Sequence, residues 1–382
     1  TFQQLYGMAR LWEVTNLFKG ETILLGADIT VNKGNASDWA EKAPGYVWEP
    51  AKFNGTFDGQ GHTISGVYVK GEKEDNYVGF FHRIYKDGTV KNLSIKNSYM
   101  EGTMPNTERG ATGSLAGRSN GIIDTVYSDA IVVNSARMTG GLVGMITGEG
   151  ENVIRNSWFD GKVTGITRTG GILGGIYGNK ADIRITIENC TNTGHIAVKI
   201  GQGDVGGICG MAETGGKLTI TDCLNAGTYQ TIGDDQEANT HVGGIFGSVT
   251  DRNGVASHVV LDNVYGMSDF YSKLVGWKYG EAGISSSAAV LLNMETLTAQ
   301  GGHRYARLDY AKEFALNEAG IPVPKAFGVK TVEASDLVDY SWFDASKSEY
   351  TITTAAQLEA FHVLCNGQND YFSGKTVKLG AD

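Results

Sequence analysis

Cysteine and proline are rare in this chain, with 4 and 5 residues among 382. Four cysteines are too few for a disulfide scaffold, and the absence of a Cys-x-x-Cys pair argues against a structural zinc site. No stretch approaches the roughly 18 apolar residues of a membrane-spanning helix. Basic runs never exceed two residues and the net charge is −10, so we expect neither membrane insertion by this segment nor a nucleic-acid partner.

Glycine, by contrast, is abundant, with 54 residues, yet no Gly-X-Y period exists and a collagen fold is excluded. The glycines recur in a string of two glycines, two apolar residues and a third glycine, as in Gly140-Gly141-Leu142-Val143-Gly144. Successive copies lie 27 to 37 residues apart, a period that marks a repeat architecture. The central apolar residues of the complete and degenerate copies are Phe80, Leu115, Leu142, Ile172, Ile208 and Ile245.

A second recurring segment lies between the glycine strings and places an apolar residue two positions before Asn, Asp or Thr. Its apolar–polar alternation predicts a short strand with one buried face. A third segment, such as Gly161-Lys162-Val163-Thr164, completes three short strands per repeat. The polar positions of the second segment are Asn92, Thr125, Asn156, Asn189, Asp222 and Asn263.

These repeats predict an all-β solenoid, a right-handed parallel β-helix of about six to eight coils with an N-terminal helix-strand cap. Neighbouring coils would stack at about 4.8 Å. We expect the polar column at one corner and the glycines at tight corners, where they provide positive φ. Cys190 and Cys223 share a column, so we expect reduced thiols packed in the core. A β-propeller is the structural alternative, but its Trp-Asp and Gly-His signatures are missing.

The two ends of the chain match each other. Residues 1–5 and 20–28 reappear as residues 354–358 and 374–382. Each copy begins Thr-x-x-Gln, a capping box that predicts a helix start. Because the chain begins with Thr1 and shows no signal-peptide pattern, we expect an excised piece of a longer protein. The predicted divisions are a helix-strand cap over 1–30, a β-helix with C-terminal closure over 31–325, a connector over 326–350, and the truncated start of a second copy of the unit over 351–382.

The string at residues 141–144, with its variants at 171–174, 207–210 and 244–247, resembles the GLUG motif of bacterial surface proteins. The string at residues 57–64 resembles the start of such β-helical domains. The resemblance covers roughly residues 1–325. It implies an extracellular location, on a bacterial cell surface or secreted, in large proteins that include adhesins and some proteases. In those proteases the motif lies outside the catalytic centre, so no catalytic residue is carried over.

Chemical motifs are scarce. Residues 201–206 match Gly-x-Gly-x-x-Gly by letter but lack the strand-to-helix context of a dinucleotide site. We therefore expect no cofactor and no catalytic residue. Carboxylates on strands are the remaining candidates for catalysis, because glycoside-cleaving enzymes need two carboxylates that converge. The simpler interpretation is that these side chains are solvated charges. These carboxylates are Asp124, Asp160, Asp182, Glu188 and Asp262.

Four loops at one corner vary in length: residues 134–139, 166–169, 199–205 and 232–242. Variable insertions on one side of a solenoid are where binding commonly occurs. Acidic residues in the last loop could hold calcium through several oxygen ligands, although their spacing matches no established loop, so the metal content stays open. The candidate binding residues are Arg137, Met138, Arg168, Asp234, Asp235, Glu237 and His241.

The favoured function is a non-catalytic module of a large bacterial surface protein that serves adhesion or binding. Its partner would be a host or environmental protein or glycan, with glycoproteins and immunoglobulins among the candidates. One alternative is a β-helix carbohydrate-active enzyme, a polysaccharide lyase or hydrolase. That alternative requires carboxylates with shifted pKa values beside an aromatic-lined cleft. The other alternative, a structural stalk or spacer, requires neither a cleft nor a partner.

Overall fold

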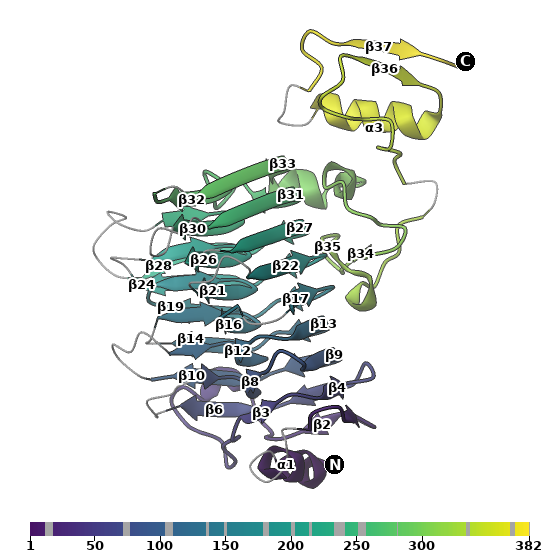
Figure 1. Ribbon diagram of the computed structural model, residues 1–382. Coiled ribbons are helices and arrows are strands. Elements are labelled where there is room, and N and C mark those ends of the chain that lie inside the picture. The colour runs from purple at the N-terminus through teal and green to yellow at the C-terminus, as the bar shows by residue number, and fades with distance from the viewer. Residues whose placement is uncertain are drawn as a thin grey trace.

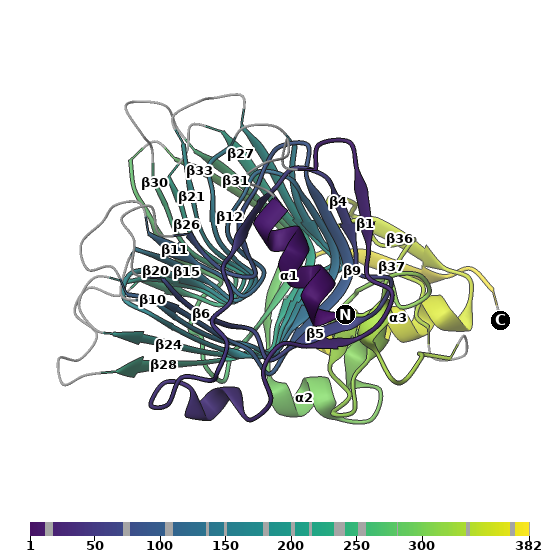
Figure 2. The same cartoon turned by 90° about the horizontal axis from the view of Figure 1, so that it is seen from below.

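A computed structural model shows a parallel β-solenoid of about seven turns, which confirms the predicted fold class (Figure 1). Each full turn visits four sheets in the order A, C, D and B before it returns to sheet A. In Figure 2, which views the solenoid from its N-terminal end, the chain passes clockwise through sheets C, D and B as it recedes, so the coils are right-handed. The structure describes residues 1–11, 18–71, 77–103, 110–134, 137–148, 151–178, 183–199, 203–213, 216–232, 241–250, 257–280, 282–333, 337–366 and 371–381.

Sheet A is the largest of the sheets in the described residues, with 13 strands. Its strands pair from coil to coil, which satisfies their backbone hydrogen-bonding groups although many of the strands are short. The strands are β1 (Thr22–Leu24), β2 (Ile29–Thr30), β4 (Thr56–Asp58), β5 (Thr63–Ser65), β9 (Thr89–Lys96), β13 (Ile122–Ser128), β17 (Glu151–Arg155), β18 (Trp158–Phe159), β22 (Arg184–Glu188), β23 (Thr191–Asn192), β27 (Lys217–Asn225), β31 (His258–Met267) and β33 (Gly283–Leu292).

The other three sheets complete the walls of the solenoid. Sheet C consists of β6 (Tyr68–Gly71), β10 (Tyr99–Gly102), β14 (Ile131–Asn134), β19 (Lys162–Gly165), β24 (His195–Lys199) and β28 (Thr228–Ile232). Sheet D consists of β7 (Tyr77–Val78), β11 (Ala111–Thr112), β15 (Met138–Gly140), β20 (Arg168–Gly170), β25 (Asp204–Gly206) and β29 (His241–Gly243). Sheet B consists of β3 (Ala51–Phe53), β8 (Phe81–Ile84), β12 (Ala116–Ser119), β16 (Val143–Ile146), β21 (Leu173–Tyr177), β26 (Cys209–Glu213), β30 (Phe246–Thr250) and β32 (Val275–Lys278).

The glycine strings form the junction between sheets D and B, which we call the crease, and their role differs from the prediction. The string glycines do not take positive φ. Most of them are required because the two sheets approach so closely that no Cβ fits. A Cβ on Gly144 would lie 2.5 Å from the backbone nitrogen of Thr112, and one on Gly140 would lie 1.9 Å from the carbonyl oxygen of Val143. The expectation of positive φ at these glycines was therefore wrong; the constraint is steric.

Positive φ belongs instead to the polar column, which lies at a bend of sheet A as predicted. All six of its members have φ between 50° and 58°. Asn and Asp tolerate this left-handed region better than other residues with a Cβ. Their side chains also bond along the column: Asn189 Nδ2 donates to Asn156 Oδ1 at 3.1 Å, and Asn263 Nδ2 donates to Asp222 Oδ1 at 2.6 Å. The bend therefore has a conformational and a hydrogen-bonding reason for these residue types.

Thr125 is the exception in this column, because a β-branched residue is strained at its φ of 58°. We expect Thr125→Asn to raise the free energy of unfolding by about 1 kcal/mol, since it relieves part of the left-handed penalty. The midpoint of urea unfolding measures this change. Thr125→Ala removes the β-branch without adding an amide, so its midpoint should lie between those of the wild type and Thr125→Asn. A lower midpoint for Thr125→Asn would contradict the assignment of strain.

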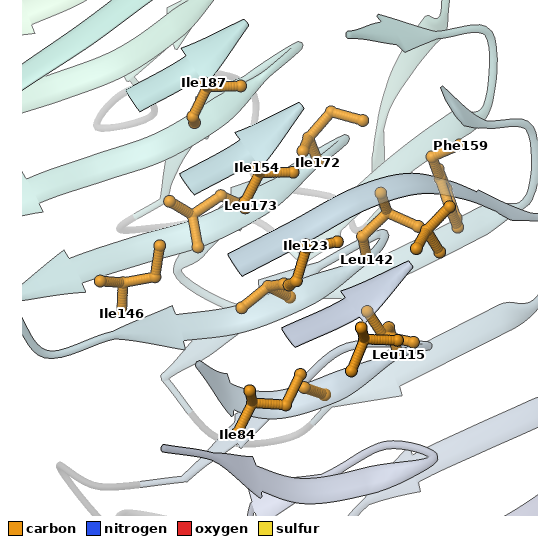
Figure 3. Packing of buried hydrophobic residues seen from close by; sticks show 14 of the residues in the cluster. Ile84, Leu115, Ile123, Leu142, Ile146, Ile154, Phe159, Ile172, Leu173 and Ile187 are labelled. Carbon is orange, nitrogen blue, oxygen red and sulfur yellow. The ribbon is translucent and has the colours of Figure 1, made fainter. Parts of the chain in front are cut away.

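The interior of the solenoid is apolar and continuous from coil to coil. Figure 3 shows stacked residues such as Ile84, Leu115 and Leu142, which all belong to one buried cluster. Cys190 and Cys223 lie in the same cluster as free thiols, which confirms their predicted role.

A helix packs on the N-terminal end of the solenoid, and a hairpin near the C-terminus lies against its side. Helix α1 (Phe2–Leu11) packs on the first coil, and Gln4 N donates to Thr1 Oγ1 at 3.4 Å. Helix α3 (Ala355–Asn366) repeats this cap, with Gln357 N donating to Thr354 Oγ1 at 3.2 Å. The division into four segments stays a prediction. The remaining elements are η1 (Ala36–Asp38), α2 (Met294–Thr298), η2 (Gly302–Tyr305), β34 (Phe314–Leu316), β35 (Pro322–Pro324), η3 (Lys325–Phe327), β36 (Glu349–Ile352) and β37 (Thr376–Leu379).

Candidate functional site

Sheet D contains three of the seven predicted binding residues, and a fourth directly precedes one of its strands. Met138 lies opposite Arg168 in neighbouring coils, and Asp204 lies opposite His241. Arg137 directly precedes Met138 and accepts a hydrogen bond at its carbonyl oxygen from Arg168 N at 3.0 Å. The column therefore exists because each loop from sheet C enters sheet D at the same register. The other three predicted residues, Asp234, Asp235 and Glu237, lie outside the described residues.

The lower part of this column is packed. Met138 is 1% exposed and forms a small cluster with Tyr77, Ala111 and Met145 on the outer side of the crease. Sheet B supplies Met145, and Tyr77 comes from two coils below. A ligand contact at Met138 stays a prediction, but its burial favours a structural role.

Arg168 is buried as well, at 6% exposure. Its Nη2 lies 2.6 Å from Glu213 Oε2 on sheet B, an ion pair that crosses the crease. Burial lowers the pKa of the Arg168 guanidinium, and the nearby charge of Arg137 lowers it further, whereas Glu213 raises it. Within the described part of the chain, Nη1 of Arg168 has no hydrogen-bond partner. Arg168 therefore holds sheets D and B together at a cost in desolvation.

The upper part of the column opens to solvent around His241. His241 Nδ1 lies 2.9 Å from Asp204 Oδ1. The imidazole ring stacks on Trp277 with 5.1 Å between ring centroids, and Tyr279 meets it edge-on at 5.5 Å. Trp277 is 48% exposed and Tyr279 is 40% exposed. We call Asp204, His241, Trp277 and Tyr279 the His241 cluster.

Sequence reasoning found His241 and missed its three partners. Asp204 lies in the variable loop at residues 199–205 but was not among the predicted binding residues. Trp277 follows Leu274-Val275-Gly276, a further degenerate glycine string 29 residues after Ile245. This string gives the last strand of sheet B and could have extended the repeat beyond residue 265. The aromatic pair was therefore detectable as part of one more coil.

The strand carboxylates have different surroundings. Glu188 Oε1 lies 4.0 Å from Arg155 Nη1, and Asp262 Oδ1 accepts from Ser287 Oγ at 2.6 Å. Asp124 is neutralised locally: it accepts from Arg155 Nε and from Asn156 Nδ2, both at 2.9 Å. Asp160 lies beside a cleft on the outer face of sheet A. Asp182 lies outside the described residues. Among the residues that the structure describes, no three His, Cys, Asp or Glu side chains gather as a metal site.

The fold makes this chain a parallel β-solenoid with a packed crease and an exposed aromatic cluster at His241. No family model matches it, so the GLUG resemblance stays a prediction. A segment of 137 residues, 34% of this chain, is 31% identical to "Halomucin" of Haloquadratum walsbyi. A segment of 87 residues, 21% of this chain, is 34% identical to a "Putative Gly-rich membrane protein" of Evansella cellulosilytica. These matches span 1% and 9% of the two relatives.

One solved structure is similar over most of the chain. It is described as "a putative immunoglobulin A1 protease from Bacteroides ovatus", with 16% sequence identity and a TM-score of 0.48. The alignment covers 84% of this chain and 90% of that chain. At this identity the likeness concerns the fold alone. None of the described helices has the length and apolar character needed to cross a membrane.

Proposed function

We propose that this chain is a non-catalytic binding module of a large extracellular bacterial protein and that its ligand contacts the His241 cluster. The exposure of Trp277 and Tyr279 carries the proposal, because large aromatic side chains left in solvent beside polar groups mark interaction surfaces. Trp and Tyr are also enriched among the residues that dominate binding energy. His241 and Asp204 add a hydrogen-bonding pair next to the two rings.

The comparisons support the wider part of the proposal. The matched segments are small parts of their relatives, as expected for a module within a large protein. One relative carries the words "membrane protein" in its name, which fits a surface location for the parent of this chain. We favour a protein ligand over a glycan at the His241 cluster, because exposed Trp and Tyr commonly anchor protein interfaces. Secreted glycoproteins and immunoglobulins belong in the first panel.

Trp277→Ala should weaken binding to a captured ligand at least tenfold, about 1.4 kcal/mol, because it removes the largest exposed ring of the cluster. The experiment is a pull-down from secreted host proteins with the whole chain, followed by titration of the captured protein by surface plasmon resonance. Phe270→Ala is the matched control, since Phe270 is similarly exposed, at 41%, but lies outside the cluster.

Equal affinities for Trp277→Ala and the wild type would remove the His241 cluster from the proposal. Absence of saturable binding across protein and glycan panels would favour the stalk alternative. A glycan array run beside the protein panel tests the choice of ligand class. Enzymatic activity is a separate question, which polysaccharide-degradation assays address.

A further inference from the structure

A cleft of about 540 Å³ lies on the side of the solenoid away from the crease, between the outer face of sheet A and the C-terminal closure. The β34–β35 hairpin and η3 form its outer wall, and Figure 1 shows the hairpin beside the sheet A strands. Thr191 Oγ1 donates to Pro322 O at 3.1 Å and attaches the hairpin to the sheet. The volume lies in the range of small-molecule sites. We call it the hairpin cleft.

The floor of the hairpin cleft consists of two side-chain ladders. Tyr127 lies opposite Ser94 in one neighbouring coil and opposite Trp158 in the other. Lys96, at the end of β9, lies two residues after Ser94. Asp160, directly after β18, lies two residues after Trp158. The coil stacking of the solenoid therefore sets an aromatic ladder beside a charged one.

The aromatic side chains form a continuous wall. Tyr127 and Trp158 meet with 4.8 Å between ring centroids at an interplanar angle of 61°. Phe327 of η3 approaches from the hairpin, 5.8 Å from the Tyr127 ring and 6.4 Å from the Trp158 ring. Lys96 Nζ lies 5.1 Å from the centroid of Tyr127. Two sides of the cleft thus present aromatic surface.

Polar groups lie at the edge of this wall and are linked to it. Trp158 Nε1 donates to Thr193 Oγ1 at 2.7 Å, and the Thr193 hydroxyl donates to Asp160 Oδ1. Burial raises the pKa of Asp160 and of its neighbour Asp129. Asp129 Oδ1 accepts from Asn97 N at 2.6 Å, which holds that carboxylate in place. The cleft therefore combines aromatic surface with the fixed carboxylate acceptor of Asp160.

We propose that the hairpin cleft binds a neutral saccharide, with one pyranose ring packed on Trp158 and its hydroxyl groups bonded to Asp160 and Lys96. The C–H face of a pyranose is apolar and flat, while its rim carries hydroxyl groups, so it matches an aromatic wall with carboxylate acceptors at the edge. Carboxylates outnumber cations here, because Asp160 and Glu318 line the cleft with Lys96. Acidic sugars are therefore disfavoured.

This inference is independent of the proposed function, because it concerns a different face and different residues. It also supplies the arrangement that a carbohydrate-active enzyme requires, carboxylates with raised pKa beside aromatic rings, without assigning a reaction to it. The aromatic lining would also suit an organic cation through cation–π contacts. Lys96 Nζ already lies over the Tyr127 ring, and its positive charge would repel a second cation but not a neutral saccharide.

The test uses the whole chain and a panel of neutral tetrasaccharides built from glucose, mannose, galactose or N-acetylglucosamine. Saturation-transfer NMR identifies a binder, and isothermal titration measures its affinity. Trp158→Ala removes the stacking ring and should weaken binding at least tenfold. Ala319→Trp fills the cleft from the hairpin turn without altering sheet A and should abolish binding. Trp277→Ala, in the His241 cluster, should leave the affinity for the saccharide unchanged.

The outcomes separate this inference from the proposed function. Binding that is lost in Ala319→Trp and kept in Trp277→Ala supports the hairpin cleft whether or not a protein ligand exists. No binding of any tetrasaccharide at millimolar concentration overturns the inference. Equal affinity in Ala319→Trp and the wild type, with both folded by circular dichroism, overturns it too. Binding of choline chloride in place of the saccharides would show a cation site and equally reject the proposal.

Discussion

Gly174→Ala should lower the free energy of unfolding by about 3 kcal/mol or more. A Cβ at this position would lie 2.5 Å from Gly144 O and 2.6 Å from Thr139 N. Both neighbours are backbone atoms of paired strands, so neither can rotate away as a flexible side chain would. Relief requires sheets D and B to separate at the crease, which would also disturb the coils on either side.

The measurement is the midpoint of urea unfolding, monitored by far-ultraviolet circular dichroism of the β-strands. Gly45→Ala is the matched control, because Gly45 is exposed and a Cβ there would meet no atom within 4 Å. We expect that variant to remain within about 0.5 kcal/mol of the wild type. If Gly174→Ala proves as stable as Gly45→Ala, the steric account of the glycine string is wrong.

The repeat was readable from the sequence because stacking imposes one residue type on many coils at once. Spacing alone placed the polar column, which the structure confirms. It predicted three short strands per repeat, whereas each full turn has strands in four sheets, because the glycine string spans the end of one strand and the start of the next. Spacing could not say why each glycine is needed. Gly140 and Gly144 face backbone alone, whereas a Cβ on Gly141 would meet both the carbonyl oxygen of Gly171, at 2.0 Å, and the ring of Phe159, whose Cγ would lie 2.4 Å away. Such distances depend on the angle between sheets, which no local pattern encodes.

The candidate site was only partly readable for a related reason. The variable loops predicted that Met138, Arg168 and His241 lie at one corner of the solenoid. The structure places all three at the start of strands in sheet D. Whether a residue at that corner points into the crease or toward solvent depends on how many coils cover it. Met138 has coils on both sides and is 1% exposed, whereas the cluster around His241 lies near the last coil and reaches solvent. The exposed aromatics Trp277 and Tyr279 lay beyond the point where the repeat faded.

A buried amide ladder inside the solenoid was also missed, because its residues look like turn residues in the sequence. Asn192 and Asn225 are both 0% exposed and occupy the column that Phe159 fills one coil below. Asn192 Nδ2 donates to Asn225 Oδ1 at 2.7 Å, and Asn225 Nδ2 donates to Gly244 O at 2.8 Å. Asn225 Oδ1 also accepts from Gly227 N at 3.1 Å. The ladder thus satisfies turn backbone in the core.

Asn225→Leu should therefore cost about 3 kcal/mol or more, although leucine has a similar volume and suits the apolar core around it. The change removes three hydrogen bonds and leaves buried partners without them, at about 1–3 kcal/mol each. Urea midpoints again provide the measurement. Phe159→Leu is the control in the same column, where the loss of ring volume alone should cost about 1 kcal/mol.

The double variant Asn192→Leu with Asn225→Leu decides whether the two amides act as one unit. Their mutual bond at 2.7 Å is lost in either single variant, so the second replacement should cost less than it does alone. We expect the combined loss to fall short of the sum by about 1 kcal/mol. Strict additivity, or a cost for Asn225→Leu no larger than that for Phe159→Leu, would show that the ladder fills space without bonding the coils together.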